Sequence, residues 1–347
     1  MKKILAILAN NSGFGGAANI NEAFTLYSKE YDTVEITLDF APYDFGMYSH
    51  GKRLSARKDP KSIFNVIGDK NTYLFIVDLS GLVVFNAYLS GRYSTVFLKP
   101  YDMAEIEQHN HIDKMIEELS ERKICFFFSG TRYLQHHEVV NEWVRRTGCK
   151  MNFAMPDLIR CNPNAVPLYQ PYALKSCGQK FDTFTASHSP GSKMNTKEVL
   201  GKFWNEKGSE EIVQVFDELK QSHGIESKVH GGNNSVDHKM SILTKDMSHV
   251  FVDKVSNHSA GIGKSGLEAI ALGTPVISSM QHTNNTGHYS DIPVMDVQDK
   301  TELKECILKC FQNKRFYNKQ CRDTKKWAEK INYPNTVKYI EENFIWD

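Results

Sequence analysis

Apolar and polar residues alternate along the first half of the chain in short blocks. Brief, mostly apolar runs recur, and segments with helical spacing lie between them. Short buried strands separated by helices are typical of a parallel sheet that helices cover on both faces. The predicted strands are Lys3–Ala9, Val34–Phe40, Tyr73–Asp78 (a run that ends at Ser80–Gly81), Thr95–Leu98 and Ile124–Phe128, and the predicted helices are Asn19–Tyr31 and Ala104–Glu121.

The strand-and-helix pattern stops between Asn162 and Lys180 and then begins again. Three prolines and a polar Cys-Gly-Gln-Lys stretch indicate that this interval is a connection between domains. The tail is helical from Thr301 and has a break at Asn332–Pro334. We expect ligands at the carboxyl ends of the strands in both halves. The second half has predicted strands at Phe184–Ser187, Lys228–His230, His249–Asp253 and Pro275–Ser279, and predicted helices at Glu210–His223 and Leu267–Leu272.

Chain length and net charge limit the number of domains and the possible classes of function. The 347 residues exceed what one hydrophobic core normally covers, so we expect two domains. Lys and Arg number 42 against 41 Asp and Glu. This balance argues against a general nucleic-acid binder, which needs an excess of positive charge to displace counterions.

Cysteine spacing and hydropathy indicate the compartment. The seven cysteines form no C-x-x-C pair, so we expect reduced thiols, with Cys306 and Cys310 as packing residues. The apolar N-terminal run ends at Ala9, and no later stretch approaches the ~20 apolar residues that span a bilayer. We therefore expect a cytoplasmic protein without a transmembrane segment, and peripheral membrane contact stays open.

A glycine turn follows the first predicted strand. Residues 13–18, Gly-Phe-Gly-Gly-Ala-Ala, fit the loose dinucleotide pattern G-x-G-x-x-A, and Asp39 lies ~20 residues further on. Glycines let the backbone approach a ligand, and the following helix N-terminus favours an anion, so Gly15 and Gly16 are candidate contacts to an acceptor or a phosphate. A tight turn without a ligand explains the same residues. An NAD(P)-dependent oxidoreductase is therefore one alternative.

The segment from His249 to Ser279 carries the most specific pattern. Its sequence, HVFVDKVSNHSAGIGKSGLEAIALGTPVISS, predicts a strand, a glycine-rich turn, a helix with Glu268 in its first turn, and a stop at Gly273 before the next strand. This segment resembles the donor-binding signature of retaining GT-B glycosyltransferases of group 1, or family four, which reads E-G-x-G-x-x-x-x-E-A-x-A-x-G-x-P-V-I. The match runs through Gly261, Gly263, Glu268, Ala269, Ala271, Gly273, Pro275, Val276 and Ile277.

The resemblance implies a donor site. In the family, the glutamate that matches Glu268 holds the ribose of a nucleotide sugar, and the glycine turn approaches the diphosphate and the sugar. The family's first glutamate falls on Ala260 here, and His258 with Ser259 is nearby to take over part of its role. The residues of the turn are Gly261, Ile262, Gly263, Lys264 and Ser265.

Two other interpretations of this segment have to be weighed. Ser265-x-x-Glu268 is also a capping box, which explains both residues without a ligand. The Gly-Lys-Ser triplet at 263–265 is not a P-loop, because His258 occupies the position of that motif's first glycine.

Candidate cations follow the first strand of the second half. The stretch from His188 through Lys197 resembles the family motif H-x-P-x-x-[KR]-x-x-K-G-T, in which two cations neutralise the donor diphosphate. Lys193 matches the first cation, and Lys197 is adjacent to the position of the second. Fixed cations perform an electrostatic task that a metal performs in other enzymes. The chain has no D-x-D triplet, and its histidine pairs lie in polar helical stretches, so we expect no metal site.

The first half has weaker signals. Ser129-Gly130-Thr131-Arg132 resembles a shortened form of the family's strand-end H-G-S-D-x-R, with Ser129 in place of histidine and Arg132 as a catalytic candidate. The tail resembles the family's closing helix, which crosses back to the first domain. Residues 51–58 are basic and predict either a solvated loop or a contact to an anionic acceptor.

These observations predict an α/β protein with two Rossmann-like parallel-sheet domains that face each other across a cleft, the GT-B fold. The expected boundaries are residues 1–170 on the acceptor side, 171–330 on the donor side and 331–347 for the closing helix. We expect a hexosyltransferase-type enzyme, retaining and metal-independent, that uses a nucleotide sugar. Among nucleotide sugars, we expect a UDP-sugar before any other. The acceptor is not identified among glycans, lipids, proteins and modified DNA bases. A non-catalytic nucleotide-sugar binder is a further alternative.

Overall fold

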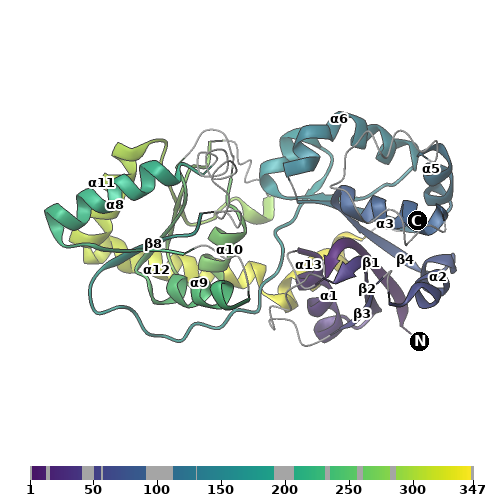
Figure 1. Ribbon diagram of the computed structural model, residues 1–347, viewed down its shortest axis with the longest axis horizontal. Helices are drawn as coiled ribbons and strands as arrows, with labels where there is room; N and C mark the ends of the chain where they lie inside the picture. The colour runs from purple at the N-terminus through teal and green to yellow at the C-terminus, as the bar shows by residue number, and fades with distance from the viewer. Residues whose placement is uncertain are drawn as a thin grey trace. The chain divides into compact units, whose positions relative to one another are not determined.

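The computed structural model divides into two compact units. One consists of Met1–Pro171 together with Tyr333–Asp347, and the other is Tyr172–Asn332 (Figure 1). The structure describes residues 2–12, 16–40, 51–55, 58–90, 112–129, 131–190, 207–230, 235–255, 261–281 and 287–344. The chain passes from one unit to the other twice, once after Pro171 and once after Asn332.

The first unit is built on a parallel sheet of seven strands in the order β3-β2-β1-β4-β5-β6-β7. The sheet grows outward in both directions from β1 and β4, so the chain reverses its direction of travel across the sheet there, at a topological switch point. The strands are β1 (Lys3–Ser12), β2 (Tyr31–Phe40), β3 (Lys52–Ser55), β4 (Tyr73–Val77), β5 (Ile124–Phe128), β6 (Asn152–Ala154) and β7 (Val166–Pro167).

Helices cover this sheet, and the last helix of the chain is one of them. Its first residue, Tyr333, donates its hydroxyl to Glu22 Oε2 at 2.9 Å on the first helix. Phe344, just past its end, packs its ring edge-on against Tyr31 and Phe75. The helical elements of the unit are α1 (Gly16–Tyr27), α2 (Pro60–Gly68), α3 (Asp78–Ser90), α5 (Ile112–Ser120), α6 (Thr131–Arg146), η1 (Pro156–Cys161) and α13 (Tyr333–Asn343).

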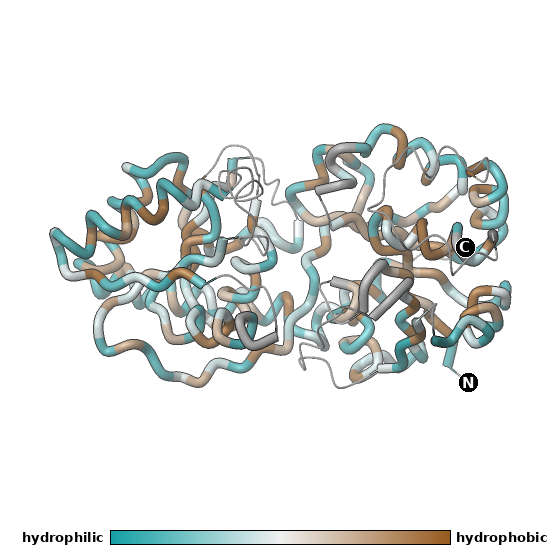
Figure 2. Tube along the Cα trace, in the orientation of Figure 1, coloured by the Kyte–Doolittle hydropathy of each residue, from teal (hydrophilic) through white to brown (hydrophobic). Residues whose placement is uncertain are grey.

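The second unit has a five-stranded parallel sheet in the order β12-β11-β10-β8-β9. Its core joins four of these strands to two of the helices, and Figure 2 shows brown on the central strands. The strands are β8 (Thr185–His188), β9 (Glu226–Val229), β10 (Val250–Lys254), β11 (Val276–Ser278) and β12 (Val294–Asp296). The helices are α8 (Ser209–His223), α9 (Ser235–Met247), α10 (Lys264–Ala271), α11 (Lys300–Gln312) and α12 (Lys314–Ala328), with the short turns η2 (Gly287–Tyr289) and η3 (Glu329–Ile331).

The predicted fold class, two parallel-sheet α/β units, is confirmed, but the helices α2, α3 and α6 of the first unit were not predicted. The apolar run that we ended at Ser80–Gly81 continues as α3. A Cβ on Gly81 would lie 2.6 Å from the Leu8 carbonyl oxygen and 2.8 Å from Ile76 Cγ2, so this glycine lets the helix approach β1 and β4. It marks close packing and not the end of an element.

Other predicted elements need smaller changes. The strand at Ile124–Phe128 has the predicted bounds, whereas the connection at 162–180 contains the short strand β7. Lys52–Ser55 is the edge strand β3, so the basic stretch is not a loop there. The predicted strand at 95–98 lies outside the described residues, as do residues 104–111 of the helix that ends in α5.

Two features bear on the predicted compartment. All seven cysteines are free thiols, and Cys310 is buried in the core of the second unit, beside Cys306. Within the described parts of the chain, no helix is both long enough and apolar enough to cross a membrane.

Candidate functional site

The carboxyl ends of β8, β10 and β11 bring together most of the signature residues of the second unit that the structure describes. The strand β10 lies between the other two, and its last residues, Asp253 and Lys254, are buried. The glycine turn that begins at Gly261 and the helix α10 follow. This is the edge at which parallel α/β sheets bind ligands.

Asp253 is the residue that shapes the turn. Its Oδ2 accepts the backbone N–H of Gly263 at 2.7 Å, and its Oδ1 lies 3.4 Å from Lys207 Nζ. Lys207 also donates to the Ser189 carbonyl oxygen at 3.0 Å. Burial raises the pKa of Asp253, but Lys207, Lys254 and the Gly263 N–H outweigh it, so the pKa lies below its usual value. The carboxylate is therefore ionised and fixes the turn to the end of β10.

The packing and backbone conformation of the turn require glycines at these signature positions, in addition to any contact with a ligand. A Cβ on Gly263 would come 3.3 Å from Asp253 Oδ2, and one on Gly266 would come 3.1 Å from the same oxygen and 2.8 Å from Ile262 Cγ2. Gly261 has a φ of +79°, a conformation that other residues rarely adopt. The fold thus requires small residues here whether or not a ligand is bound.

The helix α10 begins at Lys264, with Gly263 as its N-cap and without a side-chain cap. Ser265 and Glu268 are its second and fifth residues, so the capping-box interpretation is wrong and Glu268 does not lie in the first turn. The predicted stop at Gly273 is confirmed. This residue has a φ of +77°, and its N–H bonds the Ile270 carbonyl oxygen at 2.8 Å, as in a helix C-terminal cap.

Glu268 is buried with one oxygen bonded and the other not. Its Oε2 accepts Lys245 Nζ at 2.9 Å. Its Oε1 accepts no hydrogen bond from any residue that the structure describes, and the side-chain nitrogens nearest to it are His238 Nε2 at 3.7 Å and Lys264 Nζ at 3.8 Å. Burial raises the pKa of Glu268, but Lys245, Lys264 and His238 together hold it below its usual value. The site thus presents an ionised carboxylate with one oxygen that accepts no hydrogen bond from the described residues.

His188, which the motif resemblance makes a candidate for binding the nucleotide-sugar donor, bonds within the protein in this structure. Its Nδ1 lies 2.8 Å from the Val252 carbonyl oxygen, and its Nε2 lies 2.8 Å from Ser209 Oγ. Burial and the nearby Lys207 lower the pKa of His188 to about 3, so the ring is neutral, donates from Nδ1 and accepts at Nε2. Both nitrogens are occupied within the protein. His188 therefore joins β8, β10 and α8, and it has no ring nitrogen left for a donor.

The other predicted residues are not all described. Lys193, Lys197, His258 and Gly15 lie outside the described residues. Gly16 begins α1 and Arg132 lies at the start of α6, both in the first unit, without a described side chain for Arg132.

Sequence reasoning missed three charged residues of this edge. Asp253 and Lys245 come from neighbouring elements, and no local spacing links them to the signature. The sequence does contain a local signal for Lys207. Lys207-Gly208-Ser209 opens α8 with the order of the Lys-Gly-Thr that ends the family motif, but a longer insertion separates it from His188.

The first unit has a polar pair at the carboxyl ends of β4 and β5. Asp78 has a φ of +53°, which is uncommon for a residue other than glycine. Its two carboxylate oxygens accept the N–H of Ser129 at 2.6 Å and the Ser129 hydroxyl at 2.7 Å. Such strained backbone clusters at functional sites, and this pair lies beside the topological switch point of the sheet.

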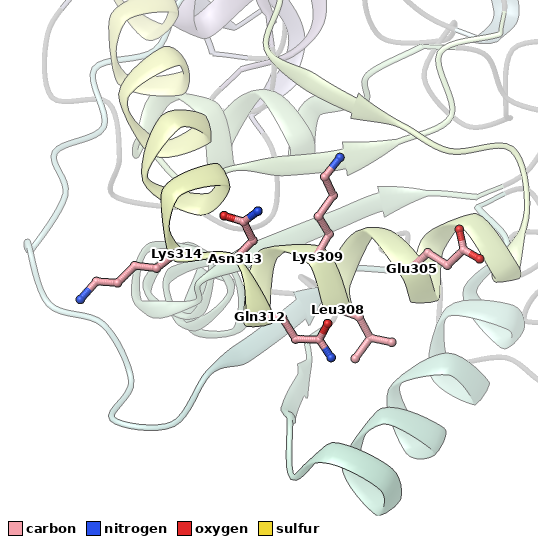
Figure 3. Close-up of a pocket in the computed structure, with 6 residues that line it drawn as sticks. All are labelled: Glu305, Leu308, Lys309, Gln312, Asn313 and Lys314. Carbon is pink, nitrogen blue, oxygen red and sulfur yellow. The ribbon is translucent and has the colours of Figure 1, made fainter.

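A surface hollow of about 560 Å³ at the junction of α11 and α12 is not part of this site. Its side chains diverge from one another in Figure 3, and none of them belongs to the signature. Ligand pockets need convergent polar groups, which this hollow lacks. Among the described side chains, no three of His, Cys, Asp and Glu gather in a way that would hold a metal. The lining residues are Glu305, Leu308, Lys309, Gln312, Asn313 and Lys314.

Comparison with known proteins gives the fold. No family model matches the sequence, and no curated protein matches it. Solved structures match the whole chain. The structure of HepE from Anabaena in complex with UDP and glucose has a TM-score of 0.57 at 11% identity, over 99% of both chains. Sucrose-phosphate synthase from Thermosynechococcus elongatus has a TM-score of 0.51 at 11% identity, over 98% of both chains.

The same fold occurs with another activity. A putative UDP-N-acetylglucosamine 2-epimerase from Listeria monocytogenes also has a TM-score of 0.51 at 11% identity, over 98% of this chain and 95% of its own. The chain therefore has the GT-B fold, as its sequence resemblance implied. Proteins with this fold are named for different reactions, so the reaction of this chain has to be argued from the site.

Proposed function

We propose that the chain is a glycosyltransferase that takes a sugar from a nucleotide sugar bound on its second unit. The observation that carries this proposal is the buried, ionised Glu268, whose Oε1 accepts no hydrogen bond from the described residues, beside the glycine turn at the carboxyl edge of the sheet. A buried carboxylate oxygen without a hydrogen-bond donor is costly, and a ligand hydroxyl would satisfy it. The ribose of a nucleotide supplies such a hydroxyl.

The cations around the turn suit a diphosphate. Lys207 and Lys254 both lower the pKa of Asp253, which holds the turn at Gly263. The N-terminus of α10 adds the partial positive charge of its free N–H groups. Departure of a nucleoside diphosphate leaves charge on its phosphates, and fixed cations stabilise that charge as it develops. We assign this task to Lys207, with Lys193 and Lys197 as the further candidates from the sequence.

The expected donor is a UDP-sugar. HepE, which has the same fold, was solved with UDP and glucose and with UDP-glucose. We place the acceptor on the first unit, at Gly15, Gly16 and Arg132, where Asp78 and Ser129 form a polar pair at the same sheet edge. The acceptor itself and the retention of sugar configuration are proposals from the resemblance alone.

Consumption of the donor tests the reaction. The purified chain is incubated with UDP-glucose, UDP-N-acetylglucosamine, GDP-mannose and ADP-glucose, and the release of nucleoside diphosphate and free sugar is measured without an acceptor. We expect slow hydrolysis of one donor, and we expect Glu268→Ala to abolish it. A change in the sugar's stereochemistry without release of UDP would instead indicate an epimerase, and binding of NAD(H) alone would indicate an oxidoreductase.

A further inference from the structure

The helix α9 turns a polar face toward the interior of the second unit. His238, Ser241 and Lys245 recur at spacings of three and four residues, so they share one side of the helix. All three are buried, with Lys245 2% exposed. A lysine buried to this degree is rare unless it is paired, so its contacts indicate what it does.

Two hydrogen bonds link this face to two parts of the candidate site, and a third joins Lys245 to Ser241 within the face. Lys245 Nζ donates to Glu268 Oε2 at 2.9 Å and to Ser241 Oγ at 2.9 Å. Ser241 Oγ in turn lies 2.9 Å from Ser189 Oγ, which follows β8 at the start of the segment that carries Lys193. The ammonium also lies 5.6 Å from the centroid of the Phe251 ring. Lys245 is therefore held on several sides and holds the Glu268 carboxylate in turn.

Stability alone does not account for this arrangement. A buried ion pair roughly balances its desolvation against its attraction, and apolar residues of similar volume serve a core as well or better. The pair also satisfies only Oε2 and leaves Oε1 of Glu268 without a donor among the described residues. A device that fixes one oxygen and leaves the other open is suited to a ligand that brings its own hydroxyl.

We infer that Lys245 is a positioning residue that fixes Glu268 through Oε2, so that Oε1 receives the ribose hydroxyls of the donor and selects ribonucleotides over 2′-deoxyribonucleotides. The inference rests on the proposed function and adds the residue that positions this carboxylate for the ribose. Lys245 acts through Glu268 and does not touch the ligand.

The charges around Glu268 provide a second test of the inference, the pH dependence of UDP binding. Burial raises the pKa of Glu268, and Lys245 is the cation that opposes it most, followed by Lys264 and His238. His238 itself is neutral, since burial lowers its pKa to about 4. Without Lys245 the pKa of Glu268 rises, so the carboxyl takes up a proton as the pH falls and becomes a weaker acceptor for a hydroxyl. In a variant without Lys245, the affinity for UDP therefore decreases as the pH falls. The wild type does not show this pH dependence.

The experiment compares the affinity for UDP and for 2′-deoxy-UDP by calorimetry at pH 6, 7.5 and 9. The variants are Lys245→Met, Lys245→Arg and Glu268→Gln. Asp246→Ala is the matched control, because Asp246 is the neighbouring buried charge on α9 and bonds Ser176 and the Cys177 N–H instead of Glu268. Lys245→Gln replaces Lys245→Met if the latter does not fold.

We expect the wild type to prefer UDP at least about 10-fold, the value of one hydrogen bond to a charged group. Lys245→Met and Glu268→Gln lose this preference, and Lys245→Met recovers UDP affinity as the pH rises. Lys245→Arg keeps the preference because it keeps the charge. Asp246→Ala lowers the melting temperature, as a purely structural change would, and retains the preference.

Two results would overturn the inference. The first is a Lys245→Met variant that retains the wild-type preference at every pH while Glu268→Gln loses it, which leaves the proposed function intact. The second is a wild type that binds no nucleoside diphosphate, which contradicts the proposed function and the inference together.

Discussion

The ammonium group of Lys207 contacts two parts of the candidate site. It pairs with Asp253, which holds the glycine turn, and it bonds the backbone of Ser189 at the end of β8. Its side chain is 18% exposed, so it is sheltered but still accessible to a ligand. A cation in this position both organises the turn and adds positive charge where the proposed diphosphate binds.

Replacement of Lys207 tests that assignment at the scale of one residue. We expect Lys207→Ala to weaken UDP binding about 10- to 100-fold, because a hydrogen bond to a charged group contributes about 1.5–3 kcal/mol. The measurement is calorimetry with UDP and with uridine. The loss should be confined to UDP, since uridine carries no phosphate.

Lys220→Ala is the control for this experiment. Lys220 lies in the same unit, but it is exposed and pairs with Glu226 on the surface. It should bind UDP as the wild type does. A Lys207→Ala variant with unchanged UDP affinity would remove Lys207 from the donor site.

Single residues were predictable only where the chain itself places them side by side. The signature from Gly261 to Ile277 is continuous, so its resemblance to the family pattern made Glu268 a candidate, and its glycine predicted the stop at Gly273. Lys245 and Asp253 reach the same place from α9 and β10. Their roles follow from the packing of separate elements, which one sequence does not reveal.

Among the elements, the neighbouring strands β2 and β3 carry an unusual pair of ionisable side chains. Glu35 and Arg53 are register partners on these parallel strands, and Arg53 Nε lies 3.2 Å from Glu35 Oε2. Burial raises the pKa of Glu35 from 4.5 to about 7, although Arg53 opposes the shift. The folded chain therefore holds a proton on Glu35 at pH values where the unfolded chain has released it.

This pair makes stability depend on pH. Because the folded pKa is the higher one, Glu35 contributes stability that is present below pH 4.5 and is lost as the pH rises through 7. The shift corresponds to about 3 kcal/mol of unfolding free energy, at 1.36 kcal/mol per pKa unit. We expect Glu35→Gln to remove this loss in urea denaturation at pH 5 and pH 8.

Glu30→Gln serves as the control, since Glu30 is an exposed acid just before β2. It should lose stability between the two pH values as the wild type does. An equal loss in Glu35→Gln would show that Glu35 does not hold the proton.

Elements were predicted best where apolar runs are short and bounded by turn residues. The strand β5 has its predicted bounds for this reason. The helix α3 was missed because it is apolar on nearly every side and begins directly after β4, so the two read as one run with a glycine at its end. The strand β3 was missed because its basic residues, one of which pairs with the buried Glu35, resemble a solvated loop.

At the scale of the molecule, the alternation of strands and helices predicted two parallel sheets, and the structure has them with seven and five strands. Strand order could not be predicted, because it depends on contacts between strands far apart in sequence. Solved structures that share the fold at 11% identity act on or bind different ligands, so the donor site in the second unit carries the functional argument.

The most direct test of that argument is calorimetric titration of the wild type and Glu268→Gln with UDP. We expect saturable binding by the wild type and about 10- to 100-fold weaker binding by the variant, since the variant replaces a charged acceptor by a neutral one. Binding of UDP with equal affinity by both proteins, or no binding by the wild type, would contradict the assignment of Glu268 to a nucleotide-sugar site.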